Sequence, residues 1–129
     1  DEVVAEVEKR GLSDSIHMLG YRTDIKELIG VSDIGILLSY REGLPRNIME
    51  LMACGKPVIG PNIRGIRDLV IDGETGFLVP VGDAVTTANC IEKLMSDAEL
   101  VSVMGVRALE EVEKYNVESV VGELKKILV

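Results

Sequence analysis

Several features that would assign a protein to a broad class are missing from this sequence of 129 residues. No apolar run approaches the roughly 20 residues that a membrane-spanning helix needs. The basic residues are scattered in ones and twos, and the formal net charge is −8. A nucleic-acid-binding protein needs a clustered basic face to displace counterions from phosphates. These absences argue against a membrane span and against nucleic acid as a partner.

Ligands for a metal or a disulfide framework are equally sparse. His17 is the only histidine, and Cys54 and Cys90 are the only cysteines. Neither cysteine falls at a metal-ligand spacing. Two isolated cysteines without a secretory leader predict reduced thiols in a cytosolic protein. We therefore expect no protein-bound metal and no cofactor, and a structural role for His17.

What is present is the composition of a globular protein, with 47% hydrophobic and 28% charged residues. A chain of this length forms one domain at most. Because it begins with Asp1 rather than methionine, we interpret it as a piece cut from a longer protein.

Short apolar runs alternate with segments of helical spacing. The runs are bounded by turn residues and rich in β-branched side chains, as is typical of strands buried on both faces. Strands are predicted at 16–19, 34–38 and 57–60, with brief extended pieces at 69–71 and 77–79. Helices are predicted over 2–10, 24–32, 45–54, 83–95, 98–114 and 117–128, with a short helix or turn at 63–68. Capping residues are predicted at Thr23 or Asp24, Ser96 and Asn116.

This alternation implies parallel pairing with right-handed crossovers. The predicted fold class is α/β, a partial doubly wound (Rossmann-like) parallel sheet with a helical C-terminal tail. In such sheets ligands lie beyond the carboxyl ends of the strands. The loops to examine are therefore 20–23, 39–44 and 60–65.

The loop at 39–44 carries the strongest chemical signal. Gly43 lets the backbone approach a ligand closely. A helix predicted to start at Pro45 directs unpaired N–H groups and its positive dipole end toward that loop. Together they predict a seat for a phosphate or another electron-rich group.

Two glutamates flank this helix start. Glu42 precedes it, and Glu50 lies roughly 7 Å along the helix axis from Pro45. Glu50 shares a face with Arg46 and Asn47, and a carboxylate can accept two hydrogen bonds from a ribose diol. The same spacing also fits a structural alternative, in which Glu50 pairs with Arg46 on a solvated face and Glu42 stabilises the helix dipole.

The surrounding sequence favours the ligand-binding interpretation. EGLPRNIMELMACG at 42–55, followed by KPVI, resembles the Glu-x₇-Glu signature of the retaining GT-B glycosyltransferases of family GT4. LGYRTDIKELIGVSDIGILLS at 19–39 and DLVIDGETGFLVPVGD at 68–83 are similar to the same family, in the same order. NIRG at 62–65 is similar to bacterial capsule and exopolysaccharide transferases, and Leu51 replaces the family's usual alanine.

The resemblance implies a role for each matching residue. Glu42 would face the donor sugar as the catalytic residue, and the backbone of Gly43 and Leu44 would approach the sugar or the distal phosphate. Glu50 would hold the ribose hydroxyls with Asn47 beside it. Tyr21 and Arg22 would lie beside the base, which completes the predicted donor-binding set.

The resemblance also implies what residues 1–129 would be: a partial C-terminal nucleotide-sugar-binding domain without its first strands and without the N-terminal domain. The whole enzyme would transfer a hexose from a UDP- or GDP-linked donor in bacterial surface polysaccharide synthesis. It would act in the cytoplasm, at the inner face of the membrane. The chain alone would be inactive, because the basic pair that grips the diphosphate and the acceptor domain lie outside it. The alternative is a non-catalytic subunit of a split GT-B enzyme that acts only with a partner chain.

Overall fold

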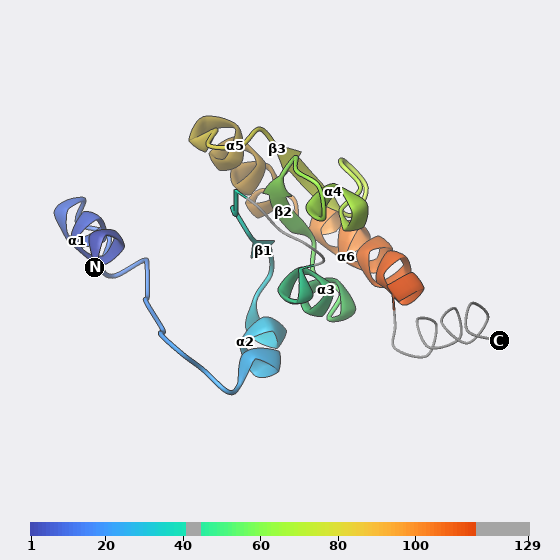
Figure 1. Ribbon diagram of the computed structural model, residues 1–129, viewed down its shortest axis with the longest axis horizontal. Coiled ribbons are helices and arrows are strands. Elements are labelled where there is room, and N and C mark those ends of the chain that lie inside the picture. Colours follow the sequence, from blue (N-terminus) through green and yellow to red (C-terminus); the bar gives the residue numbers. More distant parts are fainter. Residues whose placement is uncertain (41–44, 116–129) are drawn as a thin grey trace.

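The computed structural model describes residues 1–40 and 45–115, and three parallel strands form its sheet. β1 (Gly35–Ile36), β2 (Val58–Pro61) and β3 (Gly76–Val79) lie in that order, with Gly35 opposite Val58 and Ile59 opposite Phe77. α3 (Arg46–Ala53) joins β1 to β2, and α4 (Ile66–Leu69) joins β2 to β3 (Figure 1). The predicted alternation and parallel pairing are confirmed for these elements.

The remaining helices flank this unit on both sides in sequence. α1 (Glu2–Lys9) and α2 (Ile25–Val31) precede the sheet, and α5 (Ala84–Met95) and α6 (Ala98–Val112) follow it, with a 3₁₀ turn at Glu113–Tyr115. No helix within the described part of the chain is long and apolar enough to cross a membrane. The predicted helix at 117–128 and its cap Asn116 lie outside the described residues.

Apolar side chains cover both faces of the sheet. One core contains Ile48 and Met52 from α3, Val58, and Ala108 from α6. The other contains Ile59, Val79, Leu94 from α5 and Met104 from α6. All four residues of β2 are buried, because successive side chains of the central strand enter opposite cores. This explains the continuous apolar run that predicted the strand.

Aspartates cap three of the helices. The carboxylates of Asp1, Asp83 and Asp97 accept hydrogen bonds from first-turn N–H groups of α1, α5 and α6. The prediction that Ser96 caps α6 is therefore wrong. Ser96 instead closes α5, where its hydroxyl donates to the Glu92 carbonyl oxygen at 2.8 Å.

The predicted strand at 16–19 is also wrong. These residues form no ladder, and Ile16, Met18 and Leu19 are exposed. A strand needs a neighbour for its N–H and C=O groups, but among the described residues β1 pairs only with β2. Figure 1 shows the segment that contains 16–19 running away from the sheet, between α1 and α2. The third place in the parallel sheet belongs to β3, whose residues 77–79 were predicted to be extended.

Of the extended piece predicted at 69–71, Val70 has an extended backbone, with φ −90° and ψ 123°, but no strand forms there, for a local reason. Leu69 ends α4, and the Val70 N–H still donates to the Ile66 carbonyl oxygen at 2.8 Å. Extended pairing begins only at Asp72, which forms an isolated bridge with Gly76.

Candidate functional site

The carboxyl ends of β1, β2 and β3 meet at one edge of the sheet, where a parallel α/β fold binds its ligands. A hollow of about 210 Å³ lies there. It is lined by residues at or just beyond the carboxyl ends of the three strands and by the start of α5: Leu38, Tyr40, Pro61, Pro80, Val81, Gly82, Asp83, Ala84 and Thr87. Glu42, Gly43 and Leu44 follow β1 in the sequence but lie outside the described residues.

α3 begins at this edge. Pro45 is buried with φ −74° and ψ 112°, so it is the residue before the helix. α3 therefore begins one residue later than predicted, at Arg46. Proline has no side-chain group to cap the first turn. Instead, the Asn47 side-chain oxygen accepts a hydrogen bond from the Ile48 N–H at 3.1 Å. The side chain of the predicted site residue Asn47 thus accepts a hydrogen bond from a backbone N–H group in the first turn of α3, at the carboxyl edge of the sheet.

Glu50 lies on the solvent side of α3. Ile48 and Met52 are fully buried, while Asn47 and Glu50 are exposed three residues apart, on one face of the helix. In the part of the chain that the structure describes, no ion pair joins Glu50 to Arg46. The structural alternative for Glu50 is therefore not observed, and its carboxylate is exposed to solvent.

Tyr21 and Arg22 lie in the segment that leads into α2. Tyr21 is 94% exposed. The Arg22 guanidinium makes a two-pronged contact with Asp24, Nε to Oδ1 at 2.7 Å and Nη2 to Oδ2 at 2.5 Å. This contact raises the pKa of Arg22 and lowers the pKa of Asp24.

Asp24 differs from the other aspartates at helix starts. It precedes α2, but its side chain makes no capping hydrogen bond. Its carboxylate binds Arg22 instead, so the position predicted as a helix cap orients a predicted ligand-binding side chain. The Arg-x-Asp spacing carries this signal in the sequence, although spacing alone cannot separate a cap from an ion pair.

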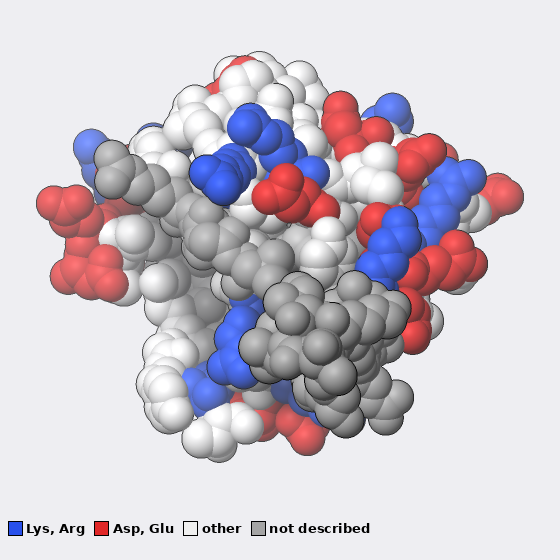
Figure 2. All heavy atoms as spheres, turned by 45° about the vertical axis from the view of Figure 1, so that its right-hand side comes forward, with Lys and Arg blue, Asp and Glu red and all other residues white. Residues whose placement is uncertain are grey.

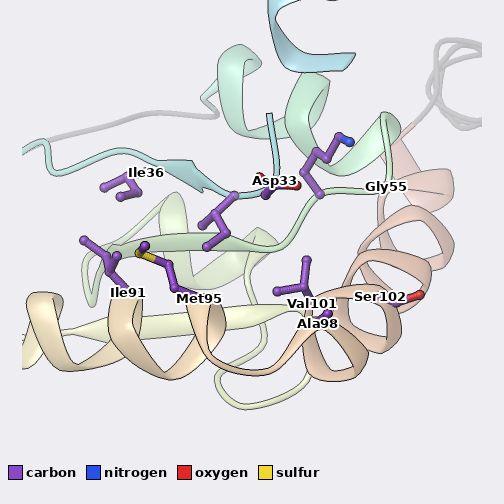
Figure 3. A pocket seen from close by; sticks show the side chains of 10 residues that line it. Asp33, Ile36, Gly55, Ile91, Met95, Ala98, Val101 and Ser102 are labelled. Carbon is purple, nitrogen blue, oxygen red and sulfur yellow. The ribbon is translucent and has the colours of Figure 1, made fainter. Parts of the chain in front are cut away.

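A larger hollow lies at the opposite edge of the sheet (Figure 3). It measures about 770 Å³ and includes Asp33 and Ile34 before β1, Lys56 before β2, and Met95 at the end of α5. These residues mark the amino ends of the strands, where ligands of this fold class do not bind. The candidate site is therefore the smaller hollow at the carboxyl edge, the edge at which α3 begins.

Comparison with known proteins identifies the family. Residues 1–111 match the profile of the family Glycosyl transferases group 1. The chain belongs to this family. It is 36% identical over 120 residues to the glycosyltransferase EpsD of Bacillus subtilis, covering 93% of this chain and 32% of EpsD. It is 37% identical over 117 residues to the N-acetyl-α-D-glucosaminyl L-malate synthase of Bacillus anthracis, covering 90% of this chain and 31% of that enzyme.

The fold matches a solved glycosyltransferase as well. The crystal structure of Anabaena HepE in complex with UDP and glucose superposes with a TM-score of 0.93 at 28% identity, covering 98% of this chain and 35% of HepE. The resemblance to GT4-type glycosyltransferases and the Rossmann-like α/β class are thereby confirmed. The chain spans about a third of the length of these relatives.

Proposed function

We propose that this chain binds the nucleotide-sugar donor of a retaining glycosyltransferase, as a partial C-terminal domain. The whole protein would transfer a hexose from a UDP- or GDP-linked donor in bacterial surface polysaccharide synthesis, at the cytoplasmic face of the membrane. The observation that carries the proposal is the likeness to HepE, whose complex contains UDP and glucose, over 98% of this chain. Because the chain spans only about a third of its relatives, the acceptor domain is proposed to lie in the rest of the protein.

The nucleotide is proposed to lie along the start of α3. Its ribose hydroxyls would bind the Glu50 carboxylate, which is exposed and unpaired among the described residues. The diphosphate would face the first turn of α3, whose N–H groups and dipole favour negative charge. Asn47 would release the Ile48 N–H to the incoming phosphate and turn its own amide toward the ligand.

The base and the sugar would lie at opposite ends of this arrangement. Tyr21 and Arg22 would contact the base, with the guanidinium of Arg22 held flat by Asp24. Glu42 would face the sugar, and the backbone of Gly43 and Leu44 would approach the sugar and the distal phosphate.

Catalysis would rest on position and charge. The departing diphosphate gains negative charge as the bond to the anomeric carbon breaks, and a preorganised helix start stabilises that charge. Holding the acceptor hydroxyl close to the anomeric carbon supplies a further part of the rate. The proposal includes acceptors that carry a negative charge, because the Bacillus anthracis relative is named for a malate product.

The test is the substitution Glu50→Gln in the full-length enzyme. Loss of a hydrogen bond to a charged acceptor costs about 1.5–3 kcal/mol, so affinity for the cognate nucleotide should fall about 10- to 150-fold. Calorimetry with UDP and with GDP measures this loss and identifies the base. Glu110→Gln, an exposed acid on α6, is the matched control and should bind like the parent. Equal affinity of Glu50→Gln and the parent would contradict the ribose contact.

A further inference from the structure

The two outer strands of the sheet differ in how their backbone groups are satisfied. At the outer side of β3, the Leu78 N–H donates to the Asp72 carboxylate at 3.0 Å. The Gly76 carbonyl oxygen accepts a hydrogen bond from the Gly73 N–H at 2.8 Å. Both groups point away from β2, so the turn before β3 covers this edge in the way that native proteins protect edge strands. The β3 edge is therefore closed by residues of this chain.

The outer side of β1 has no such cover. The N–H groups of Gly35 and Leu37 donate to carbonyl oxygens of Pro57 and β2, each at 3.0 Å. Because successive residues of a strand direct their hydrogen-bonding groups to opposite sides, the N–H and C=O of Ile36 point away from β2. Within residues 1–40 and 45–115, no group forms a hydrogen bond with Ile36 on that side. An edge that is left open in this way can pair with a further strand.

Apolar side chains lie beside the open edge of β1. The hollow of about 770 Å³ is lined mostly by apolar residues, among them Ile34, Ile36, Ile91, Met95 and Val101 (Figure 3). Other parts of the surface have a different character, since Figure 2 shows acidic and basic side chains alternating over the right-hand part of the face in view. A largely apolar hollow next to unpaired strand groups is suited to bury further protein structure.

The segment that contains α1 and residues 16–19 also lacks a partner within the described chain. α1 has no buried residue, although Val3 and Val7 lie four positions apart on one face of the helix. Ile16, Met18 and Leu19 are exposed, and Figure 1 shows this segment apart from the sheet. A helix with an apolar face is stable where that face covers a core. The apolar residues of this segment therefore indicate a second surface that further structure would cover.

The separation between this segment and the sheet is shared with HepE. The superposition has a TM-score of 0.93 and covers 98% of this chain, so it includes α1 and residues 16–19 in the same position relative to the sheet. The match takes up 35% of HepE, which therefore has further residues that can fill the space between them.

The order of the elements indicates which part of the whole protein would fill this space. α2, α3 and α4 each lead into the next place in the chain's alternation of helix and strand, and α1 leads into residues 16–19 in the same way. In a parallel sheet such a helix crosses over from a preceding strand. We propose that one or more strands that precede α1 in the whole protein enter the sheet between β1 and residues 16–19, parallel to β1. They pair with the outward groups of Ile36 and are covered by α1.

This insertion has a consequence for the candidate site. Parallel strands end at one edge of a sheet, so the loop after an inserted strand reaches the carboxyl edge at which α3 begins. The inference goes beyond the proposed function and rests on it only in taking the chain to be part of a longer protein.

Amide exchange in the full-length protein, without ligand, tests the pairing. The Ile36 amide should exchange at least about a hundredfold more slowly than in an unfolded chain, because it donates to the inserted strand. Nuclear Overhauser contacts should join the Ile36 backbone to residues that precede Asp1. Exchange at the unfolded rate would overturn the inference. Contacts to residues after Val129 would assign the edge to another segment, and protection found only in a dimer by light scattering would assign it to a second copy. Either result would overturn the inference as well.

A pair of substitutions tests whether residues 16–19 are buried in the full-length protein. Met18 and Val106 are similarly exposed in this chain, at 53% and 56%. Met18→Asp should lower Tm by about 5 °C or more, because it places a charge against the inserted strands. Val106→Asp, the matched control on α6, should stay within about 2 °C of the parent. Equal, small changes would show that 16–19 stays exposed and would overturn the inference. Neither measurement uses donor binding or transfer, so failure of the proposed function would not affect this test.

Discussion

Replacing Gly105 by alanine should destabilise the protein, although the position lies within a helix. A Cβ atom there would overlap the Gly55 carbonyl oxygen and approach the Gly55 carbonyl carbon at 3.1 Å. That carbonyl group is fixed, because the Gly55 N–H donates to the Met52 carbonyl oxygen at 3.0 Å and the Lys56 N–H donates to the Leu51 carbonyl oxygen at 3.1 Å. The overlap can be relieved only if α6 moves away from α3, which loosens the packing of Ala108 against Met52.

The expected magnitude follows from two opposing terms. Overpacking a close contact costs up to about 3 kcal/mol, while alanine is better than glycine in a helix by about 1 kcal/mol. The net loss is about 2 kcal/mol, or roughly 6–10 °C in Tm for a domain of this size. Urea unfolding should show a lower midpoint with an unchanged slope. The control is Gly30→Ala in α2, where a Cβ would meet nothing within 4 Å, and stability should rise by up to about 1 kcal/mol. A Gly105→Ala protein as stable as the parent would refute this account of the α3–α6 contact.

Two further predictions concern aspartates at helix starts. Asp24→Asn removes the charge that holds Arg22 while keeping a good helix-capping residue. Nucleotide affinity measured by calorimetry should fall severalfold with Tm unchanged, and an unchanged affinity would show that Arg22 needs no anchor. Asp83→Ala should lower Tm, because Asp83 accepts hydrogen bonds from the Thr86 hydroxyl and N–H, which lower the pKa of its carboxyl. A carboxyl whose pKa is lower in the folded than in the unfolded state stabilises the fold at pH values above its unfolded-state pKa. This stabilisation is lost as the pH falls through the folded-state pKa. The Tm gap between the parent and Asp83→Ala should therefore narrow below pH 3.8, the ordinary carboxyl value, and a constant gap would contradict the role of the charge.

The parts of the fold predicted correctly are those that local chemistry decides. β2 lies between Lys56 and Asn62 as an apolar run with turn residues on either side, and α5 follows a capping aspartate, so each is encoded by its own sequence. The segment 16–19 has the same composition as a buried strand but forms no ladder. A strand depends on a neighbour distant in sequence, and composition does not report whether that neighbour is present.

The features of the candidate site also fall into those that the local sequence predicts and those that it does not. That Glu50 lies on the exposed face of α3 follows from helical periodicity, and the structure agrees. The anchoring of Arg22 by Asp24 was not predicted. It depends on which of two partners the Asp24 carboxylate binds, the first turn of α2 or the Arg22 guanidinium, and residue spacing does not decide between them.

α6 has a consequence for how the molecule unfolds. Its Met104 belongs to the core on one face of the sheet, and its Ala108 and Val112 belong to the core on the other. Loss of this one helix would uncover both cores at once, so neither face can open fully while the other stays intact. Amide hydrogens in the middle of α6 should therefore exchange only through global unfolding, more slowly than those of α1, which has no buried residue. A helix late in the sequence thus makes the two layers a single cooperative unit.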